Sequence, residues 1–321
     1  MSSLNTMALG RVLVTGASGF VGSHLVPRLA AEGSQVYALG TEAAPALAPL
    51  LAGAFIADLR DEAAIRDAVA AARPDAIVHL AALSSAGKSF ADPALTHDVN
   101  AKGTGNLLAA ARDGAPAARI LVVSSGEVYG PQPDGTRTRE DAPFHPVSPY
   151  AESKVAAEQI AETAARDGGL DVIRARAFSH TGPGQAPTFV VPGWADQIVR
   201  IERGELPPVL QVGNLEVTRD LSDVGDVVDA YRALLAHGVR GEAYNVCRGE
   251  GVRLAEVAAR MTAMASVPIR IAVDPGRLRP ADVPWLVGDP AKIEAATGWR
   301  ATTPLDPTLS AVLAHRRRSA T

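Results

Sequence analysis

The chain has 321 residues, of which 47% are hydrophobic and 21% are charged, and its formal net charge is −4. These values predict a soluble globular protein with one extended core or two lobes, and the acidic balance argues against nucleic-acid binding. A single cysteine, Cys247, excludes an intrachain disulfide, and the absence of a secretory signal or a bilayer-spanning apolar stretch leads us to expect a cytoplasmic protein without membrane association.

Short apolar segments alternate with alanine-rich helical segments through the first half of the chain. The expected buried strands are residues 11–15, 35–39, 54–57, 76–80, 120–124 and 172–177, and the clearest helices between them are 61–72 and 98–112. This alternation predicts an α/β fold of the Rossmann type, a doubly wound parallel sheet with helices on both faces. A ligand would bind at the carboxyl ends of the strands.

A glycine-rich turn follows the first expected strand, with glycine at positions 16, 19 and 22 and a helix expected from about Phe20. Glycine lets the chain turn tightly, lets a pyrophosphate approach the helix N-terminus, and lets the helix pack on the sheet. The GxxGxxG spacing differs from GxGxxG, but its place between a strand and a helix favours a dinucleotide site. The candidate contacts are Gly16, Ser18, Gly19, Phe20, Val21 and Gly22.

A second group of residues predicts hydride-transfer chemistry. Tyr150 and Lys154 lie one helical turn apart, so their side chains share a helix face. A neighbouring ammonium lowers the pKa of a tyrosine from its usual value of about 10 and so prepares the phenol for proton transfer. We therefore predict that Tyr150 transfers the proton, that Lys154 lowers its pKa and contacts the nicotinamide ribose, and that Ser125 polarises the reacting carbonyl.

With these parts in this order, the chain resembles the extended short-chain dehydrogenase/reductase family over nearly its whole length. Members bind NAD(P) and usually a nucleotide sugar. By this resemblance Asp58 and Leu59 would contact the adenine, while Leu80, Ala81 and Ala82 would lie against the cofactor, where larger side chains would clash. An alternative for Asp58 is a role as N-cap of the helix at 61–72.

The end of the second strand bears on the choice of cofactor. Leu39, Gly40 and Thr41 offer no acidic side chain for the adenosine ribose diol, which NAD-preferring relatives usually have at this place. The sequence therefore favours NADP(H) over NAD(H). No arginine follows immediately, which leaves Thr41 and Arg60 as candidates for contacting the 2′-phosphate.

Several segments of the second half resemble GDP-mannose 4,6-dehydratases and, more closely, GDP-4-keto-6-deoxy-mannose reductases. These segments are Arg219-Asp220, Arg279-Pro280-Ala281-Asp282 and Thr297-Gly298-Trp299. The resemblance implies a GDP-linked or other nucleotide-linked sugar, with Arg219 and Arg279 on the diphosphate and Asp282 on the ribose hydroxyls. A plain surface charge pair remains the alternative for each.

The segment Ser179–Gln185 resembles the substrate loop of the reductases, although Ser179 and Ala177 replace the usual asparagine and proline. The remaining candidate substrate contacts are Ser84, Glu127, Ser179 and His180. The spacing of histidine, cysteine and carboxylate residues gives no support to a metal site.

Three reactions fit this resemblance: 4,6-dehydration, 4-epimerisation and reduction of a 4-keto-6-deoxy sugar. Gly126 stands where dehydratases have a side-chain acid, and Glu127 stands at the place of their base, so dehydration is disfavoured. We predict an NAD(P)H-dependent reductase of a GDP-4-keto-6-deoxy-hexose in deoxysugar nucleotide biosynthesis. The alternatives are a nucleotide-sugar 4-epimerase with tightly bound NAD and, less favoured, a 4,6-dehydratase or a non-catalytic dinucleotide sensor.

The domain organisation is expected to be an NAD(P)-binding Rossmann domain at 8–178 and a smaller C-terminal substrate-binding lobe at 179–315. Segments near 209–247 are expected to return to the main sheet. By resemblance to the family, helices 98–112 and 150–166 would form a homodimer. The basic run Arg316-Arg317-Arg318 is expected to complement the dipole of the last helix or to fray rather than to bind phosphate.

Overall fold

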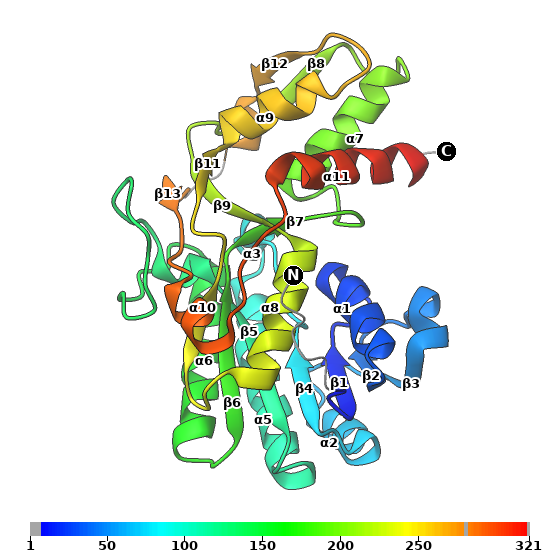
Figure 1. Cartoon of the computed structure of the whole chain (residues 1–321), viewed down its shortest axis with the longest axis vertical. Helices are drawn as coiled ribbons and strands as arrows, with labels where there is room; N and C mark the ends of the chain where they lie inside the picture. The colour runs from blue at the N-terminus through cyan, green and yellow to red at the C-terminus, as the bar shows by residue number, and fades with distance from the viewer. Residues whose placement is uncertain (1–7, 279–281, 320–321) are drawn as a thin grey trace.

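The computed structural model describes residues 8–278 and 282–319, and its described part contains a seven-stranded parallel sheet that carries a smaller lobe (Figure 1). The strand order is β10-β6-β5-β4-β1-β2-β3. The bounds are β1 (Arg11–Thr15), β2 (Gln35–Gly40), β3 (Leu51–Ile56), β4 (Ala76–His79), β5 (Arg119–Ser125), β6 (Asp171–Ala177) and β10 (Ala243–Val246). The predicted Rossmann-type fold is confirmed, and each predicted strand of the first half is present within a few residues.

Helices cover both faces of this sheet. On one face α1 (Phe20–Ala31), α8 (Val224–His237) and α10 (Ala291–Thr297) share a buried apolar cluster with the strands. On the other face α2 (Glu62–Ala72), α5 (Gly103–Gly114) and α6 (Pro149–Arg166) share a second cluster. Because both faces are buried, the strands are nearly continuous apolar runs.

The helix expected over 98–112 is divided in the structure. It consists of α4 (Pro93–His97), a π-helical turn η2 (Asp98–Lys102) and α5, which begins at Gly103. A Cβ at Gly103 would lie 2.7 Å from the Cβ of Leu59, so the glycine lets this helix approach the loop after β3. Shorter elements complete the first half: η1 (Pro45–Leu50), α3 (Ala86–Ser89) and η3 (Gly126–Tyr129).

The smaller lobe has its own apolar core, formed mainly by α7 (Val190–Glu202), α9 (Leu254–Ala263) and α11 (Leu305–Ser319). Its sheets are a pair of β8 (Val209–Val212) with β12 (Arg270–Val273) and a group in which β9 (Thr218–Asp223) pairs with β7, β11 and β13. The bounds of these partners are β7 (Ser179–Thr181), β11 (Gly251–Arg253) and β13 (Trp285–Leu286), and η4 covers Pro275–Arg277. Figure 1 shows this lobe above the main sheet, with β7 and β9 between the two.

Of the segments near 209–247 that were expected in the main sheet, β10 lies there, next to β6, whereas β8 and β9 lie in the small lobe. The burial patterns give the physical reason. All four residues of β10 are buried, as a strand covered by helices on both faces requires, whereas β8 alternates between buried and half-buried residues. Apolar content alone did not distinguish the two patterns.

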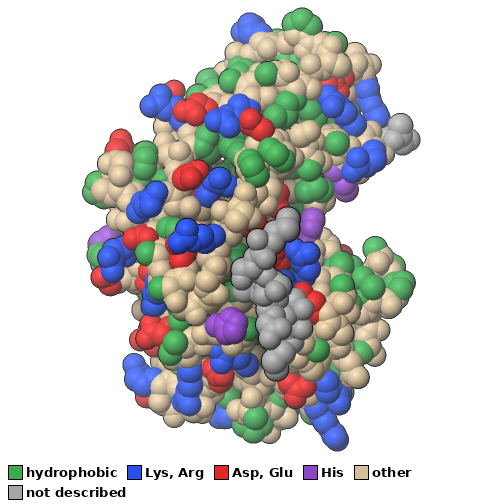
Figure 2. Space-filling view, viewed as in Figure 1, with side chains coloured by type: hydrophobic (Ala, Val, Ile, Leu, Met, Phe, Trp, Pro, Cys, Tyr) green, Lys and Arg blue, Asp and Glu red, His purple; other side chains and the backbone are tan. Residues whose placement is uncertain are grey.

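Two of the arginines at the end of α11 make ion pairs with α7. Arg316 pairs with Asp196 and Arg317 pairs with Glu202, so they tie the last helix to the lobe rather than fray. Acidic and basic side chains are mixed over the face shown in Figure 2. Among the described residues, no helix has both the length and the apolar character needed to cross a bilayer.

Candidate active site

A cavity of about 830 Å³ lies where the carboxyl ends of the sheet strands meet the small lobe. Predicted residues from both halves of the chain line it. They are Gly16, Ser18, Gly19, Phe20, Val21, Gly22, Leu80, Ala81, Ala82, Ser84, Ser125, Glu127, Tyr150, Lys154, Ser179, His180, Arg219 and Asp282. Asp58 and Leu59 are not among the lining residues, and Arg279 lies outside the described residues.

The glycine turn between β1 and α1 leaves no room for side chains at two of its positions. Gly16 has φ +70°, and a Cβ there would lie 2.9 Å from backbone atoms of Ala81. A Cβ at Gly22 would lie 2.4 Å from the carbonyl oxygen of Ala17, so side chains are excluded at both places. Gly19 caps α1 without a side-chain hydrogen bond, which leaves the first N–H groups of the helix available to an anion. This arrangement fits the pyrophosphate of NAD(P).

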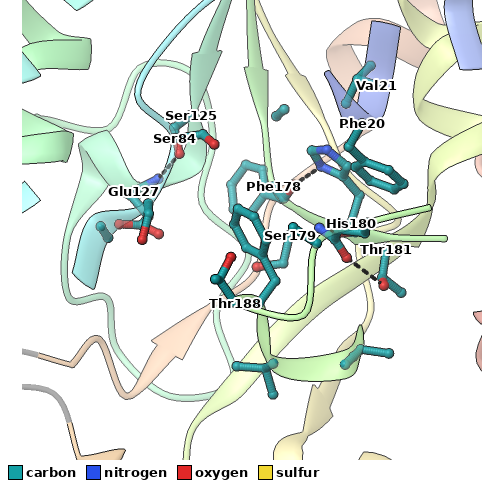
Figure 3. A pocket seen from close by; sticks show the side chains of 18 of the residues that line it. Phe20, Val21, Ser84, Ser125, Glu127, Phe178, Ser179, His180, Thr181 and Thr188 are labelled. Atoms are coloured by element: carbon teal, nitrogen blue, oxygen red, sulfur yellow. Dashed lines mark hydrogen bonds between the residues drawn. The ribbon is translucent and has the colours of Figure 1, made fainter. Parts of the chain in front are cut away.

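The side chains of Ser125, Tyr150 and Lys154 line the cavity at the carboxyl ends of the sheet strands. Ser125 ends β5, and its Oγ accepts a hydrogen bond from the backbone N–H of Glu127 at 3.2 Å (Figure 3). Tyr150 and Lys154 lie one turn apart near the start of α6, whose first turn is capped by Ser148. All three side chains thus line one cavity, and a hydrogen bond with Ser125 acts on the phenol of Tyr150.

The pKa of Tyr150 departs from the expectation. Burial raises this pKa above the ordinary tyrosine value, the negative charge of Glu127 raises it further, and the hydrogen bond with Ser125 opposes both. The net pKa of Tyr150 is therefore raised, where the sequence led us to expect that Lys154 would lower it, because removal of the phenol from water dominates. The phenol is held in its protonated form at neutral pH.

Lys154 is 7% exposed, and its Nζ donates a hydrogen bond to the carbonyl oxygen of Val123 at 2.9 Å. Burial lowers the pKa of Lys154 to about 8, and the negative charge of Glu158 opposes this decrease. His79 is buried nearby between the hydroxyls of Thr15 and Thr104, and burial together with the Lys154 charge lowers its pKa to about 3. The imidazole of His79 is therefore neutral and structural.

The loop after β3, where the adenine contacts are expected, is organised by an ion pair. Arg60 binds both carboxylate oxygens of Asp58, with the closer Nη2–Oδ2 distance at 2.7 Å, and this contact lowers the pKa of the Asp58 carboxyl. The alternative role of Asp58 as a helix cap is wrong, because Asp61 caps α2 by accepting the N–H of Ala64. Arg60, a candidate for the 2′-phosphate, already holds a carboxylate.

Two of the expected substrate contacts bind each other. Arg219 Nη2 lies 2.8 Å from Asp282 Oδ1, and Arg219 Nη1 donates to the carbonyl oxygens of Thr218 and Val283. Asn214 donates to the second oxygen of Asp282 at 3.3 Å. The guanidinium is thus held in a fixed orientation at the cavity, on the small-lobe side.

The loop after β6 lies across the cavity from Ser125 and Glu127 (Figure 3). The imidazole of His180 stacks on the ring of Phe20, with ring centroids 6.1 Å apart, and its Nδ1 lies 2.9 Å from the carbonyl oxygen of Phe178. Burial lowers the pKa of His180, so the ring is neutral. This contact joins the helix of the glycine turn to the predicted substrate loop.

Sequence analysis missed Asn100, which lies in the π-helical turn and is 1% exposed. Its side-chain oxygen accepts a hydrogen bond from the N–H of Leu83 at 2.8 Å, and its amide nitrogen donates to the carbonyl oxygen of Leu83 at 3.1 Å. The same nitrogen donates to Ser153 Oγ at 2.9 Å. Asn100 therefore fixes the loop after β4 against α6. The signal in the sequence was the poor fit of asparagine to a helix interior, whereas the π-helical turn that contains Asn100 is seen only in the structure. Elsewhere in the described chain, no three His, Cys, Asp or Glu side chains gather to hold a metal.

Comparison with known proteins identifies the class to which this fold and site belong. Residues 13–312 match the family described as GDP-mannose 4,6 dehydratase, and the chain belongs to this family of extended short-chain dehydrogenases/reductases. It is an NAD(P)-dependent oxidoreductase.

Individual relatives are similar over nearly the whole length. The GDP-6-deoxy-D-mannose reductase of Pseudomonas aeruginosa is 37% identical over 304 residues, which is 94% of this chain and 96% of the relative. A solved structure described as RMD from Pseudomonas aeruginosa complexed with NADPH superposes with a TM-score of 0.85 at 35% identity, covering 97% and 99% of the two chains. The UDP-glucose 4-epimerase of Thermus thermophilus, solved with NAD, gives a TM-score of 0.87 at 33% identity, covering 96% and 99%.

Proposed function

We propose that this protein reduces the C4 keto group of a GDP-linked 4-keto-6-deoxy-hexose with NADPH. The observation that carries the proposal is that Ser125, Tyr150 and Lys154 line one cavity together with Arg219 and Asp282 of the small lobe. Reduction requires a proton donor for the oxygen that develops at C4, and burial together with Glu127 keeps the phenol protonated. The high similarity to a GDP-6-deoxy-D-mannose reductase supports the sugar nucleotide.

The roles of the residues follow from their positions. NADPH, when bound, supplies the hydride that adds to C4. The hydroxyl of Ser125 donates a hydrogen bond to the C4 oxygen, and Tyr150 transfers its proton to that oxygen. The O–H bond of Tyr150 breaks as the O–H bond of the product forms, and the phenolate that remains takes a proton from water. Lys154, one turn further along α6, stabilises the phenolate by its charge.

Position 126 argues against dehydration. A Cβ at Gly126 would lie 3.0 Å from three atoms of the Phe178 ring, so this place is filled by an aromatic side chain. An acid that protonates a leaving hydroxyl has no room there without movement of Phe178. Reduction needs no such acid, which agrees with the packing.

The preference for NADP(H) forms part of the proposal. A Cβ at Gly40 would have its closest neighbours at 3.9 and 4.0 Å, the carbonyl oxygen of Glu42 and the hydroxyl of Ser18, so no side-chain carboxylate lies within 4 Å of that place. The space admits a 2′-phosphate without repulsion from a carboxylate at this position.

The test mixes the purified protein with NADPH and enzymatically prepared GDP-4-keto-6-deoxy-mannose and follows the absorbance of the reduced nicotinamide. The product is identified by NMR, which also distinguishes a GDP-rhamnose from a GDP-6-deoxy-talose. Stoichiometric loss of NADPH with formation of a GDP-6-deoxy-hexose is the expected result. Absence of turnover with this substrate would overturn the proposal.

The 4-epimerase is the second candidate, because the similarity to the Thermus thermophilus UDP-glucose 4-epimerase spans 96% of this chain. An epimerase regenerates its cofactor in every cycle. Interconversion of two sugar nucleotides without net consumption of added NADPH would therefore favour this candidate over the reductase.

A further inference from the structure

Behind the proposed catalytic residues lies a buried polar network centred on Glu158 of α6. Glu158 is 1% exposed, and its carboxylate is held by Arg176 of β6, whose Nε and Nη2 lie 2.9–3.1 Å from the two oxygens. Ser124 donates its hydroxyl to the same carboxylate at 2.5 Å. Burial of an ion pair is costly unless its hydrogen bonds are complete, and here they are extensive.

The network touches each element that carries a proposed catalytic group. Ser124 directly precedes Ser125 in β5, and Glu158 lies one helical turn beyond Lys154 on α6. Arg176 Nη1 donates to the hydroxyl of Tyr129, which ends the short helix that contains Glu127. The polar groups thus join the end of β5 to the face of α6 that carries Tyr150 and Lys154.

Glu158 lies one helical turn from Lys154 on the same helix, and it is the carboxylate whose charge acts on this buried ammonium. On its own helix the neighbours are neutral Tyr150 and anionic Glu158, and on β4 it faces neutral His79. Arg176 and Arg174 on β6 are cations that pair with the same carboxylate, with Arg174 at 3.9 Å from Glu158 Oε2. From β5, Val123 contributes a carbonyl oxygen and no charge.

We propose that Glu158 is a positioning residue that keeps the buried Lys154 in its ammonium form, and that Ser124 and Arg176 hold the carboxylate in place for this task. The inference rests on the proposed roles of Lys154, but it concerns the charge of this lysine and not the identity of the sugar. Removal of the carboxylate would leave Lys154 beside two cations in a dry site, which favours the neutral amine.

The test uses cofactor binding, so that it does not depend on the sugar substrate. The dissociation constant of NADPH is measured by nucleotide fluorescence between pH 6.5 and 10 for the wild type, Glu158→Gln and Glu162→Gln. Glu162 is the matched control because it lies one turn further along α6, is half exposed and pairs with Arg174. The wild type is expected to lose affinity with a midpoint near pH 8, where the pKa of Lys154 lies.

In Glu158→Gln the midpoint is expected about one pH unit lower, since a neighbouring carboxylate shifts a buried pKa by roughly this amount or more. Glu162→Gln is expected to keep the wild-type midpoint. A folded Glu158→Gln protein with the wild-type midpoint would overturn the inference. Inactivity of the wild type toward GDP-4-keto-6-deoxy-mannose would refute the proposed function and leave this binding test intact.

If Glu158→Gln does not fold, Ser124→Ala decides the question. Ser124→Ala removes the donor but leaves Arg176 on the carboxylate, so the protein is expected to fold and to show a midpoint of NADPH affinity below that of the wild type by less than about one pH unit. The control is Ser222→Ala in β9, because Ser222 Oγ is buried without a hydrogen-bond partner among the described residues. An unchanged midpoint in Ser124→Ala would overturn the inference.

Discussion

Arg219 and Asp282 form an ion pair, with Nη2 and Oδ1 2.8 Å apart, across a separation of 63 residues in the chain. Their side chains are 15% and 21% exposed, so the pair is largely shielded from water. A guanidinium with its position fixed in this way presents a preorganised cation to a diphosphate. The carboxylate orients the cation and at the same time offsets part of its charge.

Substitution Asp282→Asn is expected to raise the KM for the nucleotide sugar about tenfold and to leave kcat within about threefold, because Arg219 loses the partner that fixes its orientation. Steady-state kinetics at saturating NADPH measures both constants. Asp306→Asn, which removes an exposed ion pair with Arg260, is the control and is expected to change neither constant. An unchanged KM in Asp282→Asn would remove the pair from substrate binding.

Substitution Tyr150→Phe is expected to lower kcat by about 10²- to 10⁴-fold, the range typical for loss of a general acid. The dissociation constant of NADPH should stay within about threefold, because the aromatic ring is retained. Tyr244→Phe provides a control, since this hydroxyl accepts the N–H of Val239 and serves the fold. Near-wild-type turnover in Tyr150→Phe would exclude the phenol as the proton donor.

Substitution Gly40→Asp is expected to reverse the cofactor preference. The nearest atoms to a Cβ at this position are at 3.9 and 4.0 Å, so the Cβ is added without displacement of its neighbours. The carboxylate would accept hydrogen bonds from the ribose diol of NADH and repel the 2′-phosphate of NADPH. Fluorescence titrations with both nucleotides should show at least about tenfold weaker NADPH binding, whereas Gly40→Ala should keep the wild-type preference.

Substitution Gly22→Ala is expected to weaken NADPH binding by about 10²-fold, because the new Cβ would overlap the backbone of Ala17 and distort the turn. The measurement is the NADPH dissociation constant together with the midpoint of thermal unfolding. Gly105→Ala in α5 is the matched control, since its Cβ would meet only an ordinary contact at 3.8 Å. Wild-type affinity in Gly22→Ala would show that the turn tolerates a side chain.

Local sequence patterns predicted much of the sheet and of the cofactor turn. Apolar runs of four to six residues locate the strands, because a strand that is buried on both faces must be apolar along most of its length. The glycines at 16 and 22 mark places where a side chain would meet backbone. The spacing of Tyr150 and Lys154 was equally informative, because helix geometry alone places them on one face.

Features that depend on contacts between distant segments could not be predicted in this way. The pairing of Asp58 with Arg60 was missed although the residues are close in sequence, since either side chain had another plausible partner. The raised pKa of Tyr150 depends on how completely the fold excludes water, which no pattern of residues records. The network of Glu158, Arg176 and Ser124 joins three elements and became visible only in the packed structure.

The position of β10 at the edge of the main sheet has a consequence for the synthesis of the chain. When residues up to Phe178 have left the ribosome, β6 still presents an unpaired edge, because the strand that covers it lies at 243–246. Unpaired edges invite association with other chains. Segments of the small lobe are translated both before and after the strand that completes the sheet. The main sheet of the nascent protein therefore stays open at β6 until residues 243–246 have been synthesised.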